Sequence, residues 1–408
     1  MSGAIAPVEP SAPPTAPLRR TALYPFHLAR SAHLVPFGGW EMPLYYRSIL
    51  DEHRAVRTGV GLFDVGHMGI VTLVGGHAGA LLSRRTTANA ERIAPGQCRY
   101  SFMTEFSGAI LDDLLITRLD AHDPHAPTYL VVPNAARTPK VVEVLTEHRR
   151  PDTELTVHNP AITILAVQGP GSRALLEAQF GWSLAGLKFY HGRFFPAVGG
   201  TDVPPDGVVG RAFPESLDRL FYVSRTGYTG ELGYELFVRA DDAVPLAERL
   251  VGNGAVPCGL GARDTLRQEK GYLLSGQDFN RDRTPLEAGQ EKFVEMDHPF
   301  VGREALEAEA KAGVPVHWAG MRTDDPEAIP RHGTPILVAG RVVAHATSGG
   351  RSPTLQAGIA LGYLPPPLDA VGTELALEIR GRAVPAHVVA LPFVPAGGAR
   401  RPNTTTSP

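Results

Sequence analysis

Residues 107–116 read SGAILDDLLI and place two adjacent carboxylates, Asp112 and Asp113, between a glycine turn and an apolar run. The run over residues 114–116 is typical of a strand that is buried or nearly so. Neighbouring side chains on a strand point to opposite faces, so one carboxylate can face a cavity while the other faces solvent or caps a turn. Two interpretations follow: a solvated acidic pair after a turn, or an acid at a pocket, where burial and hydrogen bonding tune it for proton handling.

Length and composition set the class of protein. The 408 residues exceed what one hydrophobic core usually supports, which predicts two or three domains. A net charge of −3 gives no basic excess for nucleic acid, and no apolar run approaches the length of a membrane span. The two cysteines, Cys98 and Cys258, form neither a disulfide framework nor a metal signature, and the fifteen histidines show no H-E-x-x-H spacing. We therefore expect a cytoplasmic protein with no metal, no membrane contact and no nucleic-acid partner.

The pattern of secondary structure changes along the chain. Residues 1–20 and 397–408 are poor in core-forming residues, which predicts disordered tails. Residues 21–310 mix strand and helix patterns irregularly, which indicates an α+β region. Beyond it, over residues 311–396, short strand patterns alternate with Gly/Pro turns and indicate an all-β domain, a barrel or a sandwich. Within the α+β region we expect helices at residues 51–59, 78–87 and 138–150, and strands at residues 100–104, 129–134 and 163–168.

A glycine-rich segment, TGYTGELGYEL at residues 226–236, follows a predicted strand. Three glycines in seven residues let the backbone turn sharply and approach a ligand closely. We expect four side chains to surround that approach: Tyr228, Glu231, Tyr234 and Glu235.

A second glycine pair opens a predicted helix in CGLGARDTLR at residues 258–267, and such a helix start attracts anions and carboxylates. The glycines at residues 169–171 do not match G-x-G-x-x-G, so we expect no dinucleotide site there. The lone histidine His67 is expected to be structural, because imidazole serves well as a core donor and acceptor.

Ten motifs, in this order along residues 21–395, resemble the glycine-cleavage T-protein family, the tetrahydrofolate-dependent aminomethyltransferases. The resemblance also extends to folate-dependent demethylases and to the folate halves of enzymes that oxidise dimethylglycine and sarcosine. The motifs are TALY (21–24), FGGWEMP (37–43), LFDVGHM (62–68), GAILDDLLI (108–116), VQGP (167–170), TGYTGELGYE (226–235), CGLGARDTLR (258–267), TPLEA (284–288), FVGREAL (300–306) and TSG (347–349).

The resemblance implies a fold and a site. The fold is α+β, with three subdomains in a cloverleaf, a central folate channel and a C-terminal all-β barrel. A carboxylate can accept the neighbouring N–H and amino groups of a pterin, tyrosines offer apolar faces to its ring, and an arginine suits the acidic tail of folate. By this resemblance the catalytic acid is Asp113, and the tetrahydrofolate-binding residues are Tyr100, Leu115, Asn134, Tyr228, Glu235 and Arg263.

The implied reaction takes the aminomethyl group from the lipoyl arm of a carrier H-protein, releases ammonia and forms 5,10-methylene-tetrahydrofolate. Three departures from the family pattern bear on the one-carbon donor rather than on the folate site and keep an alternative open, a demethylase acting on a small methylated amine, sulfonium or secondary metabolite. Residues 267–272 look more like the demethylating relatives, Lys292 stands where a tryptophan is usual, and Gly66 replaces a usual serine. A third hypothesis, a folate-binding protein without catalysis, is disfavoured because Asp113 is retained.

Overall fold

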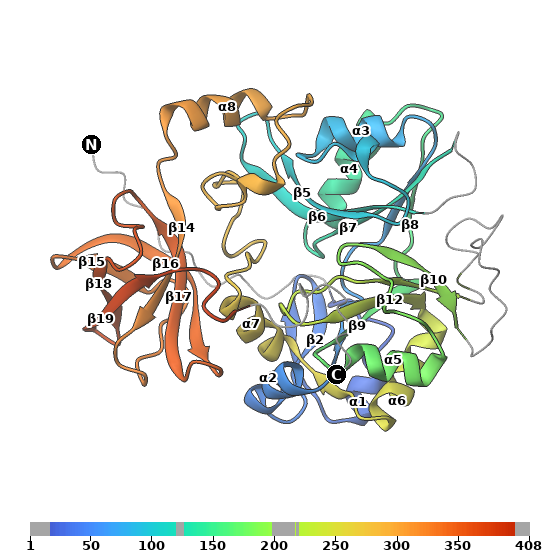
Figure 1. Ribbon diagram of the computed structural model, residues 1–408, viewed down its shortest axis with the longest axis horizontal. Helices are drawn as coiled ribbons and strands as arrows, with labels where there is room; N and C mark the ends of the chain where they lie inside the picture. Colours follow the sequence, from blue (N-terminus) through green and yellow to red (C-terminus); the bar gives the residue numbers. More distant parts are fainter. Residues whose placement is uncertain (1–16, 120–125, 198–216, 218–219, 396–408) are drawn as a thin grey trace, which may run out of the picture.

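The computed structural model describes residues 17–119, 126–197, 217 and 220–395 (Figure 1). Arg19 falls in the predicted N-terminal tail but pairs with the chain near Trp40: its N–H donates to Gly39 O at 3.0 Å, and its guanidinium lies 4.3 Å from the Trp40 ring centroid. The tail prediction is wrong for Arg19, because these partners are distant in sequence and composition does not reveal them. Residues 1–16 and 397–408 lie outside the described residues.

A six-stranded sheet with two packed faces forms the lower right of Figure 1. The central strand β9 alternates between two cores: Leu165 and Val167 pack with α1, α5 and α6, whereas Ile164 and Ala166 pack with α2 and α7. This alternation explains why β9 is buried along its whole length. The strands, in sheet order, are β10 (Gly192–Pro196), β11 (Leu220–Ser224), β12 (Gly233–Arg239), β9 (Ile162–Gln168), β3 (Gly61–Asp64) and β13 (Val256–Cys258); the helices are α1 (Tyr24–Ala29), α2 (Ile49–Thr58), α5 (Ser172–Phe180), α6 (Ala240–Gly252) and α7 (Leu260–Glu269).

A five-stranded sheet lies above it in Figure 1 and contains the acidic pair. Leu114 and Ile116 of β6 pack into the core under α3 and α4, so this face of β6 is closed. Asp113 and Leu115 point to the opposite face and are half-buried. The elements are β5 (Cys98–Thr104), β6 (Ile110–Arg118), β7 (Thr128–Pro133), β4 (Val71–Val74), β8 (Glu154–Val157), α3 (Ala78–Arg85) and α4 (Thr138–His148); β1 (His33–Phe37) and β2 (Trp40–Tyr45) form a separate pair.

The C-terminal region is a closed six-stranded barrel, reached through α8 (Arg303–Ala312) and drawn at the left of Figure 1. Side chains such as Met321, Ile336 and Leu377 fill its interior. The barrel contacts α7 through β16 and β17. The α+β class and the C-terminal barrel are therefore confirmed, and the sandwich alternative is excluded. In order around the barrel, the strands are β14 (His317–Thr323), β17 (Ala357–Leu364), β16 (Arg341–Ser352), β15 (Pro335–Val338), β18 (Glu374–Ile379) and β19 (Arg382–Val389).

The helices predicted from periodicity are present with shifted ends, as α2, α3 and α4. The longest helix among the described residues, α6, has 13 residues, and none of the described helices has both the length and the apolar character that crossing a membrane requires. Cys98 and Cys258 are buried free thiols.

Candidate active site

A β-bulge sets the direction of the two aspartates on β6. The pairing of β5 with β6 shifts between Met103 and Thr104, which pair with Asp112 and Ile110 and leave Leu111 unpaired. Beyond the bulge the alternation is regular, with Phe102 opposite Asp113 and Tyr100 opposite Leu115. Asp112 is 0% exposed, whereas Asp113 is half-buried. The two carboxylates therefore lie in different surroundings.

Asp113 is held by two neutral donors. The Tyr100 hydroxyl donates to Asp113 Oδ2 at 2.7 Å, and the Asn134 side-chain amide donates to Asp113 Oδ1 at 2.6 Å. The same Asn134 amide lies 2.9 Å from Asp112 Oδ1, which also accepts from the Ser275 hydroxyl at 3.2 Å. The Asn134 backbone N–H donates to Asp112 Oδ2 at 3.0 Å. Asp112 thus orients Asn134, and Asn134 orients Asp113.

Burial raises the pKa of both carboxyl groups, and the charge of Asp113 raises the pKa of Asp112 further. Among the described residues, the groups that lower the pKa of Asp113 are neutral: the hydrogen bonds from Tyr100 and Asn134 only partly oppose burial. Burial, followed by the charge of Asp113, also raises the pKa of Tyr100 well above its ordinary value. A buried carboxyl group with a raised pKa holds a proton more readily than an exposed one, which suits it to accept and return a proton.

A second group of predicted site residues lies on β12, α7 and the loop before β12. The Arg263 guanidinium lies 4.8 Å from the centroid of the Tyr228 ring, whose hydroxyl donates to Leu273 O. The Thr226 hydroxyl donates to Glu235 Oε2. Burial raises the pKa of Glu235, and the Thr226 hydrogen bond and the Arg263 charge partly offset this rise. Burial lowers the pKa of Arg263.

The two groups are close enough to interact. The charge of Asp113 contributes to raising the pKa of Tyr228, after burial, and Tyr228 contributes in turn to the shift of Tyr100. All seven predicted residues are half-buried, so each still has surface that a ligand could contact. The structure therefore brings together the residues Tyr100, Asp113, Leu115, Asn134, Tyr228, Glu235 and Arg263.

Two other residues of the glycine-rich segment, Tyr234 and Glu231, have partners inside the protein. Tyr234 is 0% exposed and packs in the core of the six-stranded sheet, because alternation along β12 turns it away from Glu235. Its hydroxyl accepts a hydrogen bond from Arg173 Nε at 3.3 Å. Glu231 forms an ion pair with Arg57 at 2.9 Å. The expectation that Tyr234 faces the ligand approach is therefore wrong, whereas Glu231 stays beside the glycine turn but is paired with Arg57.

The start of α7 is occupied by a carboxylate of this chain. The Gly259 N–H donates to Glu52 Oε2 at 2.8 Å, and the backbone N–H groups of Tyr46 and Arg47 donate to Glu52 Oε1 at 2.7 and 3.1 Å. The prediction that this helix start attracts a carboxylate is confirmed, but the partner is internal. Arg263 projects from the first turn of the same helix.

Two residues near Asp113 were not predicted. Ser275 contacts Asp112, and the Phe293 ring packs edge-on to Tyr100 with a centroid distance of 4.9 Å. Phe293 follows Lys292, the residue at the place of the usual tryptophan, and Lys292 Nζ lies 5.0 Å from the Phe293 ring centroid. An aromatic side chain is therefore present beside Tyr100, one position after the place where the family usually has tryptophan.

Gly66 and His67 form a tight, buried corner. A Cβ on Gly66 would lie 2.1 Å from Thr163 Oγ1, so the serine that is usual in the family does not fit beside this threonine without movement. His67 is 3% exposed, and burial, followed by the charge of Arg263, lowers its pKa to about 4. The ring is neutral and buried, but its Nδ1 has no hydrogen-bond partner among the described residues, so the expected role of His67 as a core donor and acceptor is not observed at that atom.

One group of described side chains has the composition of a metal site. Glu295, Asp297 and His298 each place one potential ligand atom within 4.8 Å of the others. Both carboxylates already have partners: Arg92 donates to Asp297 at 2.5 Å, and the Asn89 N–H donates to Glu295 at 3.2 Å. Because Arg92 already pairs with one of the two carboxylates and a backbone N–H with the other, we assign no metal to this cluster.

Comparison with known proteins identifies the family. Residues 23–204 and 218–298 match the GCVT N-terminal domain, and residues 317–395 match the glycine cleavage T-protein C-terminal barrel domain. An aminomethyltransferase of Synechococcus sp. (strain CC9902) is 39% identical over 378 residues, 92% of this chain and 98% of that protein. An aminomethyltransferase of Symbiobacterium thermophilum is 40% identical over 387 residues, 92% of this chain and 97% of that protein.

The fold agrees with these matches. The crystal structure of glycine cleavage system aminomethyltransferase T from Bartonella henselae superimposes with a TM-score of 0.82 at 30% identity, covering 93% of this chain and 99% of that one. Fold and relatives together define the class: the protein is an enzyme, a transferase of the aminomethyltransferase type. The chain belongs to the glycine cleavage T-protein family.

Proposed function

We propose that this enzyme transfers a one-carbon unit from the aminomethyl-lipoyl arm of an H-protein to tetrahydrofolate, with release of ammonia, in the cytoplasm. The observation that carries the proposal is the placement of Asp113. It is half-buried, hydrogen-bonded to Tyr100 and Asn134, and within electrostatic reach of Tyr228, which packs against Arg263. One acid with a raised pKa thus lies beside flat aromatic and cationic groups suited to a folate.

The residues present fit tetrahydrofolate. Among the described residues, the one hydrogen bond recorded for the Glu235 side chain is that from Thr226 to Oε2, which leaves Oε1 for an incoming donor such as the pterin edge. Tyr100, Tyr228 and Leu115 would offer apolar surface to its rings, and Arg263 would meet its acidic groups. When bound, tetrahydrofolate supplies the nitrogen that accepts the one-carbon unit.

Asp113 would orient the bound folate and take up or return the proton that moves during transfer. Its two present donors are neutral, so ionisation of Asp113 is not fixed by a salt bridge and its protonation can change during turnover. Positioning of both reactants in a site shielded from water would supply much of the rate.

The donor is tested directly. Purified enzyme is given tetrahydrofolate with either aminomethyl-lipoyl H-protein or, in parallel, a series of methylated amines and sulfonium compounds, and folate products and ammonia are measured. We expect ammonia and a one-carbon folate with the H-protein donor. Turnover with a small methylated donor alone would instead support the demethylase alternative, with which the sequence of residues 267–272 agrees. Failure of tetrahydrofolate to bind would reject both.

A further inference from the structure

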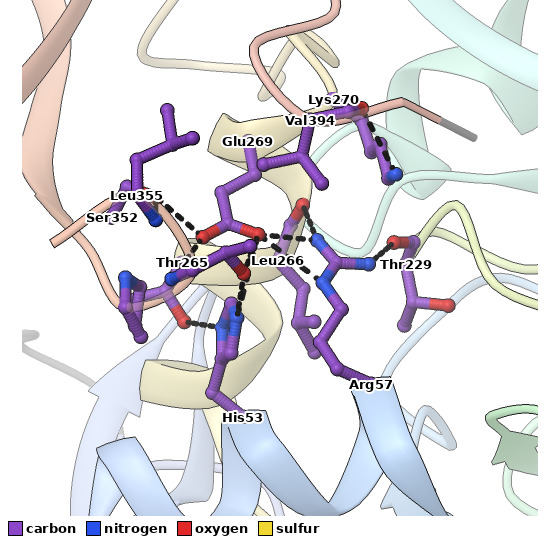
Figure 2. Close-up of polar contacts among 12 residues, drawn as sticks. His53, Arg57, Thr229, Thr265, Leu266, Glu269, Lys270, Ser352, Leu355 and Val394 are labelled. Atoms are coloured by element: carbon purple, nitrogen blue, oxygen red, sulfur yellow. Dashed lines mark hydrogen bonds and ion pairs between the residues drawn. The ribbon is translucent and has the colours of Figure 1, made fainter. Parts of the chain in front are cut away.

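Arg57 on α2 uses its guanidinium entirely inside the protein, with 11% of its side chain exposed. Nε and Nη2 donate to Glu269 Oε2 at 3.2 and 2.7 Å. Nη1 donates to Thr229 O at 2.8 Å and to Glu231 Oε1 at 2.9 Å. Figure 2 shows the guanidinium between Glu269 on α7 and Thr229 on the loop before β12. One side chain therefore joins two elements that also bear predicted folate contacts.

Glu269 holds Arg57 in place because it is itself fixed. Its carboxylate is 0% exposed and accepts from the Ser352 hydroxyl at 2.6 Å and from the Thr354 N–H and hydroxyl at 3.0 and 2.9 Å. His53 Nε2 lies 3.4 Å away. Burial acts to raise the pKa of Glu269, but the interactions with His53, Ser352 and Arg57 outweigh burial and lower the pKa to about 2. Glu269 is thus a permanent anion at neutral pH, and it anchors the Arg57 guanidinium from the side opposite the loop.

Arg57 holds the loop at Thr229, one residue after the predicted folate contact Tyr228. Thr229 directly follows Tyr228, and its hydroxyl donates to Gln168 Oε1 at 2.9 Å. Gly230 has a φ of +73°, and a Cβ there would lie 2.2 Å from Lys270 Cε, so the loop packs closely on α7. Lys270 in turn donates to Val394 O at 3.1 Å (Figure 2). The backbone on the C-terminal side of Tyr228 is therefore tethered chiefly through Thr229 and its donor Arg57.

We propose that Arg57 is a positioning residue for folate binding: it fixes the turn at residues 227–231 so that the Tyr228 ring stays in place against Arg263. The inference rests on the proposed function, because the ring is taken to contact tetrahydrofolate. The physical basis is preorganisation: a loop already held in its binding conformation loses less conformational entropy when the ligand binds. Arg57 touches no predicted folate contact itself and acts through the turn.

The network has two limbs that can be cut separately. The loop limb runs from Arg57 to Thr229 and Glu231, and the barrel limb runs from Glu269 to Ser352 and Thr354. A residue that merely stabilises the fold would matter equally through either limb. A positioning residue would affect folate binding through the loop limb alone.

The test compares four variants of the full chain by tetrahydrofolate titration and thermal unfolding. Arg57→Lys keeps the charge beside Glu269 but cannot reach Thr229 and Glu231 at once, and Glu231→Ala cuts only the loop limb. We expect both to raise the Kd of tetrahydrofolate, by about 5- to 20-fold for Arg57→Lys. Ser352→Ala cuts the barrel limb, and it should lower Tm while leaving the Kd within about 2-fold. Arg30→Lys, at a bidentate pair with Glu248 that joins α1 to α6, is the matched control and should leave the Kd unchanged.

Kinetics separate positioning from general damage. In the loop-limb variants the KM for tetrahydrofolate should rise while kcat at saturating folate stays within about 2-fold, since Asp113 is untouched. An unchanged Kd in Glu231→Ala and Arg57→Lys would overturn the proposal, and so would an equal rise in Ser352→Ala. If Arg57→Lys does not fold, Glu231→Ala still decides, because it leaves the Arg57–Glu269 pair intact. Failure of the unaltered enzyme to bind tetrahydrofolate would refute the proposed function instead.

Discussion

Two buried carboxylate sites in this protein have pKa values that are shifted in opposite directions, although burial itself acts to raise the pKa at both. Burial raises the pKa of Asp113 and Asp112 on β6, whereas the pKa of Glu269 is lowered to about 2 although Glu269 is 0% exposed. The difference lies in the donors. Glu269 faces Arg57, His53 and three donors from the barrel end of the chain, whereas the aspartates share the neutral amide of Asn134. Cationic partners fix a charge, and neutral partners leave it free to change.

The comparison separates a carboxylate that stabilises the fold, Glu269, from one suited to proton transfer, Asp113. A carboxylate with a complete set of partners holds elements together and gains nothing from losing its charge. A half-buried carboxylate with few, neutral partners is poised near a change of protonation, which is the property a proton-handling residue needs. The predictions below test this division by removing one charge at a time.

The largest expected effect is that of Asp113→Asn. The substitution keeps size and hydrogen-bonding shape but removes basicity, and we expect turnover to fall by roughly 10²–10⁴-fold, the usual range for a positioned acid or base. Thermal unfolding and most of the tetrahydrofolate affinity should be retained. Turnover is measured with the one-carbon donor that the assay under Proposed function identifies. Near-normal turnover would show that this acid does no proton work.

Glu269→Gln tests the opposite side of the comparison. Loss of the charge leaves Arg57 buried without its main partner, and we expect the free energy of unfolding at pH 7 to fall by roughly 3 kcal/mol. Denaturant unfolding measures this change. Glu248→Gln, at a more exposed ion pair with Arg30, should cost less than about 1 kcal/mol. An equal loss in the two variants would mean that the buried network adds nothing special.

The stability difference between the unaltered enzyme and the Glu269→Gln variant should depend on pH. The folded pKa of Glu269 lies below its ordinary value of 4.5, so its charge contributes stability that is fully present above about pH 4.5. That contribution is lost as the pH falls towards 2. The difference in unfolding free energy between the unaltered enzyme and Glu269→Gln should therefore shrink between pH 5 and about pH 2 to 3, where it is measured by urea titration. A constant difference across this window would contradict a lowered pKa.

The next effect is on binding. Glu235→Gln replaces an oxygen that would accept from the pterin edge by an amide that donates, which leaves a buried donor poorly paired. We expect tetrahydrofolate binding to weaken by roughly 1–3 kcal/mol, measured by calorimetry. The Thr226 hydrogen bond can be kept by the remaining oxygen, so Tm should change little. Unchanged affinity would remove Glu235 from the site.

Much of the fold could be predicted from the sequence, because its signals are local. The apolar run at residues 114–116 predicts the buried side of β6, and the short strand patterns separated by turns over residues 311–396 predict an all-β domain, which the family resemblance narrows to a barrel. Strand alternation also separates Asp112 from Asp113. The bulge at Leu111 left no signal, because it depends on how β5 pairs with β6.

The parts that could not be predicted depend on partners far apart in the chain. Arg57 and Glu269 are 212 positions apart, and Glu52 caps α7 across 207 positions. No spacing rule reveals such pairs. The side chains of Tyr234 and Glu231 were assigned to the ligand approach by proximity in sequence, whereas strand direction and a distant arginine decide where they lie.

The smallest expected change in turnover is that of Asp112→Asn, and it is the sharpest test of the two faces. Asp112 is 0% exposed and, among the described residues, contacts the predicted site through Asn134, so replacing its carboxyl group removes no group that meets substrate. An asparagine at this position would point its own N–H donors at groups that now donate hydrogen bonds to Asp112. This mismatch should cost roughly 1–3 kcal/mol of unfolding free energy and lower turnover by less than about 10-fold, through a less well held Asn134.

Asn134→Ala provides the matched control, because it removes the link and leaves the Asp112 carboxyl group in place. If Asp112 acts only through Asn134, Asp112→Asn in the Asn134→Ala background should lower turnover no further, because the connection to Asp113 is already lost. Turnover of the single and double variants, each corrected for the folded fraction, measures this coupling. A larger loss in Asp112→Asn than in Asp113→Asn would mean that the proton-handling acid lies on the closed face of β6, and that the division between the two carboxylate sites is drawn in the wrong place.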